Sequence, residues 1–207
     1  MAYFPFFQDV QGQKVLLIGA GKVALHKARI MLDYGVRLYV VAPKIDPEFR
    51  KLCGIIIWQR AFCPNDLEKM SFVRCATNNC GLNRQIAGLC HERGIPINSV
   101  DDRENCSFLF PALIHRGALT IGICTGGTSP SAASELKKAI ERSLPDDIET
   151  ILEYLKKIRP VVKKEFSQQQ TRAIIFQQIW EACLCYNRSL TEEEECRIMD
   201  KQGESRE

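Results

Sequence analysis

The chain has 207 residues, of which 45% are hydrophobic and 26% are charged, and its formal net charge is +3. This length suits one domain with a sizeable core, or a domain with a smaller appendage. A nucleic-acid-binding protein would carry a stronger basic bias. No apolar run approaches the roughly 18–20 residues that span a bilayer, and the N-terminus lacks the features of a secretory signal. We therefore expect a cytoplasmic protein with no nucleic-acid or membrane partner, disordered only in its polar tail, residues 191–207.

The ten cysteines are scattered along the chain, and no two of them form a C-x-x-C pair. The spacing most typical of zinc and redox sites is therefore absent. We expect reduced thiols, several of them serving as small core residues, and no resident metal site.

Short apolar runs alternate with helical patterns over the first hundred residues. Runs that are apolar throughout indicate strands buried on both faces, and their alternation with helices predicts a parallel, doubly wound sheet. The fold class is therefore α/β of the Rossmann type. The predicted strands are Lys14–Ala20, Arg37–Ala42, Ile55–Gln59, Phe72–Ala76 and Ile95–Val100, and the predicted helices are Lys22–Tyr34, Pro47–Leu52 and Leu82–Glu92.

The pattern changes after Asp102. Two β-like runs, Ser107–Ile114 and Ala118–Cys124, are joined by a short segment that ends in Gly117, which predicts a hairpin. Ser129 stands where it can cap a helix, with Pro130 at the first helical position.

From Asp146 the sequence is helical with no strand signal, and Pro160 is expected to begin a second helix that continues through Trp180. A small hairpin and helix thus precede an all-helical C-terminal region. The predicted regions are 1–112 for the nucleotide-binding domain, 113–145 for the hairpin and its helix, and 146–207 for the helical part.

The segment Gly19–Ala24 matches G-x-G-x-x-G/A between a predicted strand and a predicted helix, which is the context this motif requires. Gly19 permits the tight turn, and Gly21 lets the backbone approach a pyrophosphate. Lys22 and Val23 offer backbone N–H groups at the positive end of the helix dipole. The motif predicts a bound nicotinamide dinucleotide, with NAD as the expected cofactor.

The second strand ends without the acidic residue that usually binds the ribose hydroxyls of NAD. Pro43 and Lys44 follow that strand and are expected to border the adenosine, and the nearest acid is Asp46. Lys44 could instead face the 2′-phosphate of NADP, so this feature leaves NAD and NADP both open. Thr77 and Asn78 end the fourth strand and are expected beside the cofactor, the alternative being plain turn chemistry.

Several further motifs follow the glycine loop in a fixed order. They are the aromatic opening Tyr3–Phe7 and the segments 15–43 (VLLIG to VVAP), 76–78 (ATN), Leu82–Asn83, 94–101 (GIPINSVD), 106–112 (CSFLFPA), 116–121 (RGALTI) and 125–130 (TGGTSP). In these motifs residues 1–145 resemble the precorrin-2 dehydrogenases, the dehydrogenase/ferrochelatase type of siroheme synthase.

The resemblance implies that the chain oxidises the tetrapyrrole precorrin-2 to sirohydrochlorin with NAD+. In some members of that family ferrous iron is then inserted to give siroheme. It also implies a homodimer in which residues 113–145 build the interface. Three alternatives stay open: dehydrogenation alone, a regulatory module that binds a dinucleotide without turnover, and a chelatase with a vestigial cofactor site.

The resemblance also assigns roles to single residues. Asp101 matches the family's aspartate and would accept a proton as hydride leaves, although an aspartate after a strand also suits a turn. Asn98, Arg116 and Ser129 are candidates for binding the substrate. Arg116 could equally be a solvated residue of the hairpin, and Ser129 a helix cap.

Overall fold

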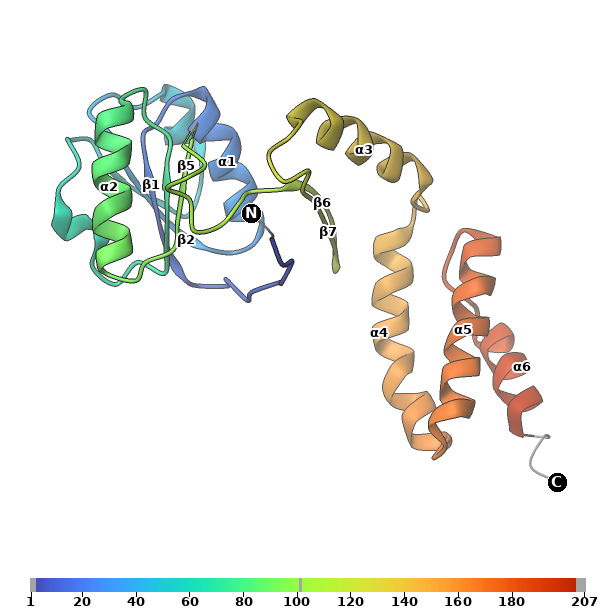
Figure 1. The fold of residues 1–207 in the computed structure, drawn as a ribbon. Helices are drawn as coiled ribbons and strands as arrows, with labels where there is room; N and C mark the ends of the chain where they lie inside the picture. Colours follow the sequence, from blue (N-terminus) through green and yellow to red (C-terminus); the bar gives the residue numbers. More distant parts are fainter. Residues whose placement is uncertain (1–2, 101, 204–207) are drawn as a thin grey trace. The chain divides into compact units, whose positions relative to one another are not determined.

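The computed structural model describes residues 3–100 and 102–203. The chain divides into two units, Met1–Phe110 and Pro111–Glu207, each described by itself below (Figure 1).

The first unit is built on a parallel five-stranded sheet in the order β3-β2-β1-β4-β5. This is the strand order of a Rossmann-type fold, with the topological switch point between β1 and β4. The predicted parallel sheet is confirmed, with strands shorter than predicted at one or both ends. The strands are β1 (Lys14–Ile18), β2 (Arg37–Val41), β3 (Ile55–Trp58), β4 (Phe72–Cys75) and β5 (Ile97–Ser99).

Two apolar cores cover the two faces of this sheet, because successive side chains of β1 point to opposite sides. On one face, Val15 and Leu17 pack against helix α1 (Lys22–Asp33) and the short 3-10 helix η1 (Pro47–Lys51). On the other face, the intervening residues of β1 pack against helix α2 (Cys80–Glu92) and the 3-10 helix η2 (Pro64–Leu67). Burial on both faces explains why the strands are apolar throughout.

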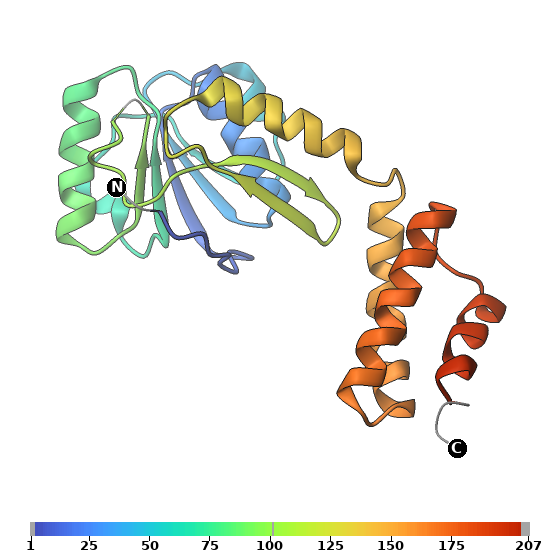
Figure 2. The same ribbon diagram turned by 45° about the vertical axis from the view of Figure 1, so that its right-hand side comes forward.

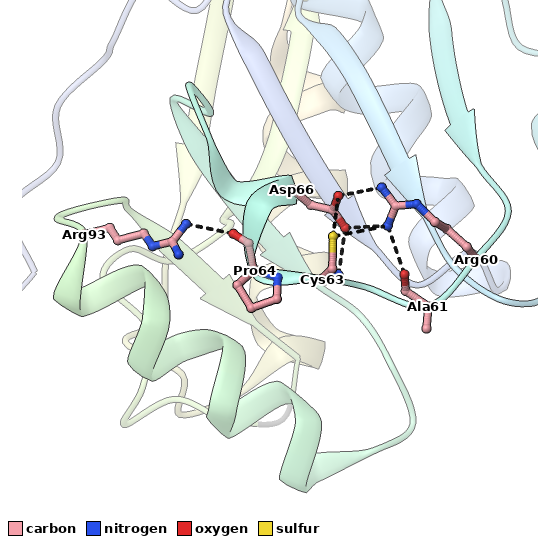
Figure 3. Close-up of polar contacts among 6 residues, drawn as sticks. All are labelled: Arg60, Ala61, Cys63, Pro64, Asp66 and Arg93. Carbon is pink, nitrogen blue, oxygen red and sulfur yellow. Dashed lines mark hydrogen bonds and ion pairs between the residues drawn. The ribbon is translucent and has the colours of Figure 1, made fainter.

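The connection from β3 to β4 contains η2, which the apolar pattern did not predict. Asp66 is buried there and receives a bidentate pair of hydrogen bonds from Arg60, at 2.6 and 2.8 Å (Figure 3). The backbone N–H of Cys63 donates to the same carboxylate at 2.9 Å. Arg93, just after α2, donates to the carbonyl of Pro64 at 2.7 Å, so polar contacts fix this crossover.

The second unit begins with the antiparallel hairpin of β6 (Ala112–Arg116) and β7 (Leu119–Ile123), beside which lies α3 (Pro130–Ser143) (Figure 2). The predicted strand start at Ser107 is wrong. The N–H of Ser107 donates to the carbonyl of Ile97 in β5, so the backbone at Ser107 is hydrogen-bonded to the first unit and does not pair with β7. His115 and Arg116 belong to β6, and the turn lies at Gly117, whose φ is +56°.

Three helices complete the second unit: α4 (Ile148–Glu165), α5 (Gln169–Tyr186) and α6 (Glu192–Gly203). The prediction that Pro160 begins a new helix is wrong, because Pro160 lies inside α4. Buried residues stand on both sides of it, Ile158 and Val162, and both pack into the core shared with α5. This burial holds the helix together across the proline, and the break falls after Phe166 instead.

The expected disorder of the tail is also wrong for the part of it that the structure describes. Thr191 and Glu194 form a reciprocal cap at the start of α6: the Thr191 N–H donates to Glu194 at 2.8 Å, and the Glu194 N–H to the Thr191 hydroxyl at 3.4 Å. This is a capping box, whose T-x-x-E pattern is visible in the sequence. Arg188 adds a bidentate contact to Glu194.

Within residues 3–100 and 102–203, no helix is both long and apolar enough to cross a membrane.

Candidate functional site

The glycine loop after β1 lies against the loop after β4. The N–H of Gly19 donates to the carbonyl of Val41 at 2.9 Å, and the N–H of Ala76 donates to that of Ile18 at 2.7 Å. Gly19 has a φ of +99°, and a Cβ there would overlap the carbonyl of Ala76. Glycine is therefore required, and the ends of β1, β2 and β4 are drawn together at the switch point.

Gly21 is the N-cap of α1, and no side chain caps that end of the helix. The first turn of α1 contains no acidic residue, and a Cβ added to Gly21 would meet nothing within 4 Å. Lys22 and Val23, which follow, are exposed. Uncapped N–H groups at a helix N-terminus and open space at the glycine fit a pyrophosphate, so this region can hold a dinucleotide.

In the loop after β2, the carboxylate of Asp46 has a structural role. One carboxylate oxygen of Asp46 caps η1 by accepting from the N–H of Glu48 at 3.0 Å, and the Asp46 N–H donates to the carbonyl of Ala20. Pro43 and Lys44 are both exposed at this end of β2. Asp46 is therefore held as a helix cap beside the glycine loop.

A buried amide shapes the loop after β4. Asn83 donates from Nδ2 to the carbonyl of Thr77 at 3.1 Å, and its Oδ1 accepts from the Thr77 hydroxyl at 2.5 Å and the Cys75 thiol at 3.0 Å. Asn79 caps α2 by accepting from the Leu82 N–H. Thr77 is thus fixed beside the glycine loop, and Asn78 is exposed next to it.

The loop after β5 carries the proposed proton acceptor. Asp101 itself lies outside the described residues. Asp102 is half-buried, and its two carboxylate oxygens accept from Nδ2 of Asn105 at 2.8 and 2.9 Å. Asn98, in β5, is buried, and its amide contacts Arg74 and the carbonyl of Phe108.

Arg116 and Ser129, the two candidate substrate-binding residues of the second unit, both form hydrogen bonds with backbone groups of that unit. Arg116 donates to the carbonyls of Pro145 and Asp146, and its Nε lies 3.7 Å from Glu149. Ser129 is the N-cap of α3, with its hydroxyl accepting from the Ala132 N–H at 3.2 Å. The predicted cap is confirmed, and Arg116 ties the hairpin to the start of α4.

Sequence reasoning gave no role to Arg74, Cys106 or Asn83. A signal existed for the first of them, since Arg74 is the single charged residue in an otherwise apolar strand, FVRC. The predicted free thiols are confirmed, because all ten cysteines are unpaired, and Cys75, Cys90 and Cys183 are buried. Among the residues described, no group of three or more His, Cys, Asp or Glu side chains could hold a metal ion.

Comparison with known proteins agrees with this geometry. The chain is 36% identical over 182 residues to a siroheme synthase of Ectopseudomonas mendocina (strain ymp), which covers 87% of the chain and 39% of that protein. It is 38% identical over 170 residues to the siroheme synthase of Buchnera aphidicola subsp. Acyrthosiphon pisum (strain APS), covering 81% of the chain and 36% of that protein. The chain thus spans about 40% of the length of the curated relatives it matches.

A solved structure of SirC, a precorrin-2 dehydrogenase, has the same fold, with a TM-score of 0.73 at 19% identity over 98% of this chain and 100% of that one. The family model described as "Putative NAD(P)-binding" matches residues 6–112, which is more than half of the chain. The chain therefore belongs to this NAD(P)-binding family.

Proposed function

We propose that the chain dehydrogenates precorrin-2 to sirohydrochlorin, with NAD+ as the hydride acceptor. The observation that carries the proposal is the similarity to siroheme synthases over 87% of the chain. In this reaction the tetrapyrrole loses one hydride and one proton, so the site needs a hydride acceptor and a base.

Bound NAD+ supplies the hydride acceptor. Gly19 and Gly21 keep the loop open to the pyrophosphate, and the N–H groups of Lys22 and Val23 bind its oxygens. Pro43 and Lys44 border the adenosine. Thr77 and Asn78 lie on the other side of the glycine loop, where they orient the cofactor at the switch point.

Asp101 is the proposed base, and it accepts the proton that leaves the tetrapyrrole. Arg116 and Ser129 are the proposed contacts for carboxylate arms of the substrate, in addition to their contacts within the chain. We assign the cofactor to residues 1–112 and the substrate and a homodimer interface to residues 113–145, with residues 146–207 as a helical appendage.

One feature of α3 supports the interface. Of its 14 residues only Ala133 is buried, and Leu136 is 50% exposed. A two-stranded hairpin with a single helix is marginal alone, so a second copy that covers this surface would stabilise it.

The test is an anaerobic assay with enzymatically generated precorrin-2 and NAD+, without metal. NADH and the sirohydrochlorin spectrum should appear together. Asp101→Asn should slow the conversion by about 10²-fold or more, whereas Asp102→Asn, the neighbouring control, should retain most of the rate. Binding of NAD+ without conversion would contradict the proposal and favour a regulatory module.

The same assay resolves the two finer questions. Replacing NAD+ by NADP+ should lower kcat/KM. If NADP+ is preferred instead, and Lys44→Glu removes that preference, Lys44 contacts a 2′-phosphate. Addition of ferrous iron after the oxidation measures chelation, which is present only if siroheme forms faster than in a protein-free control.

A further inference from the structure

Arg74 is a charged residue in a central strand of the first unit, and its side chain is only 5% exposed. Its guanidinium stacks on the ring of Phe110, 4.8 Å from the centroid, and donates a hydrogen bond to Oδ1 of Asn98. Among the residues that the structure describes, no carboxylate pairs with Arg74, and burial lowers its pKa. Burying a cation is costly unless its N–H groups find partners, so the hydrogen bond to Asn98 and the Phe110 ring offset part of this cost.

The contact fixes which way the Asn98 amide points. Arginine only donates hydrogen bonds, so the atom facing it must be the amide oxygen. The Asn98 NH2 group is thereby directed to the carbonyl of Phe108, at 2.9 Å, and to the sulfur of Cys106, at 3.7 Å. Arg74 thus orients a donor that holds the far end of the loop after β5.

Cys106 holds the near end of the same loop. Its sulfur accepts from the N–H of Ser99 at 3.1 Å and lies 3.3 Å from the Ser99 carbonyl and 3.1 Å from the carbonyl of Asp102. Val100 in turn donates to the carbonyl of Cys75 at 2.9 Å. One thiol therefore ties Ser99, the last residue of β5, to Asp102 in the loop that follows.

We propose that Arg74, Asn98 and Cys106 are positioning residues: they anchor residues 99, 100, 102 and 106–108 at the loop after β5, and turnover depends on this anchoring. The effect on turnover rests on the proposed function, whereas the anchoring of the loop does not. This role of Asn98 in the loop is separate from the substrate contact that the resemblance implies. The anchoring of the loop is a property of the chain alone, so it is tested separately from turnover.

The first measurement is amide hydrogen exchange of the full chain, read by mass spectrometry on peptides that cover residues 99–108. Cys106→Ala should speed exchange there by about tenfold, because the sulfur contacts are lost. Cys106→Ser, which keeps a donor and an acceptor, should restore most of the protection. Cys90→Ala is the matched control: it removes a buried thiol from α2 and should leave this peptide unchanged. Unchanged exchange in Cys106→Ala would overturn the proposal.

The second measurement is turnover with precorrin-2 and NAD+. Cys106→Ala and Arg74→Met should lower kcat by about 10- to 100-fold with little change in the KM for NAD+, as expected when a reacting group is misplaced. Cys106→Ser should recover most of kcat, and Cys90→Ala should retain it. If Cys106→Ala exchanges faster yet keeps full kcat, the positioning role fails. If the unaltered chain shows no turnover, the proposed function fails, while the exchange result still decides whether the loop is anchored in this way.

Discussion

Gly19 and Ala76 approach each other so closely that a Cβ on Gly19 would overlap the carbonyl oxygen of Ala76 and come within 2.8 Å of its carbonyl carbon. The obstacle is backbone, in the loop that follows β4, so it cannot move aside as a flexible side chain would. The first glycine of the motif therefore serves packing between two strand ends as well as the approach of a ligand.

Gly19→Ala should accordingly destabilise the first unit. The positive φ alone costs about 1–3 kcal/mol, and the overlap adds to that cost. Gly88→Ala is a suitable control, because Gly88 is an exposed residue of α2 whose Cβ would meet nothing within 4 Å. It should raise the stability by about 0.5–1 kcal/mol. Thermal melts followed by circular dichroism compare the two, and equal melting temperatures would contradict the packing role of Gly19.

Gly21→Ala should weaken the binding of NAD+ while leaving the stability of the fold almost unchanged. Gly21 has a φ of −89° and a ψ of −175°, which alanine adopts readily, and the added Cβ would face open space. We expect the free energy of unfolding to change by less than about 1 kcal/mol. The Kd for NAD+, measured by calorimetry, should rise by about tenfold or more, because the methyl group occupies the space that the pyrophosphate needs. Unchanged affinity would place the cofactor elsewhere.

The Arg60–Asp66 pair should make the stability of the first unit fall in acid. Burial raises the pKa of Asp66, but the hydrogen bonds from Arg60 and from the Cys63 N–H outweigh it and bring the pKa below the ordinary value of 3.8. The unfolded chain thus takes up the proton first as the pH falls. The stabilisation is complete above about pH 4 and is lost as the pH drops through the lower, folded value.

Asp66→Asn should therefore lower the unfolding free energy at pH 7 and remove part of the decline in stability below about pH 4. Glu48→Gln removes two solvent-exposed ion pairs, with Lys51 and with Arg29, each worth at most about 1 kcal/mol, and should lower the unfolding free energy only slightly. Urea titrations at a series of pH values measure both. Parallel curves for Asp66→Asn and the unaltered chain would show that the pair does not contribute in this way.

Pro160→Ala should stabilise the helical unit. Proline inside a helix removes one backbone hydrogen bond and crowds the preceding turn, at a cost of about 3 kcal/mol relative to alanine. Pro160 is exposed, so the replacement leaves the buried residues Ile158 and Val162 in place. A higher melting temperature for the helical signal is expected. A lower one would mean that the proline stabilises a bend that the packing requires.

The sequence predicted the parallel sheet because the strands are buried on both faces, which leaves a continuous apolar signal in runs such as VLLI. It also predicted the glycine loop and the cap at Ser129, since these depend on residues close together in the chain. The errors at Ser107 and Pro160 arose where a distant contact decides the outcome: hydrogen bonding to Ile97 in one case, and packing against α5 in the other.

The polar side chains around the site were harder to foresee for the same reason. Arg74 and Asn98 are 24 positions apart and meet only because β4 and β5 are neighbours in register. Asn83 reaches Thr77 across the turn into α2, and its burial depends on how that helix sits on the sheet. No local pattern encodes such pairings, although a lone charge in an apolar strand shows where to look for one.

Because three cysteines are buried, the reactivity of their thiols reports when the surrounding structure unfolds. Cys75 and Cys90 lie in the core of the first unit, where burial raises the pKa of each thiol, to about 12 and about 11. Cys183 lies in the core of the helical unit, and burial raises its pKa as well. Alkylating reagents attack thiolates, so these three thiols should not react until the structure around them unfolds. Pulses of such a reagent, mapped residue by residue, would time the melting of each half of the chain in a single sample.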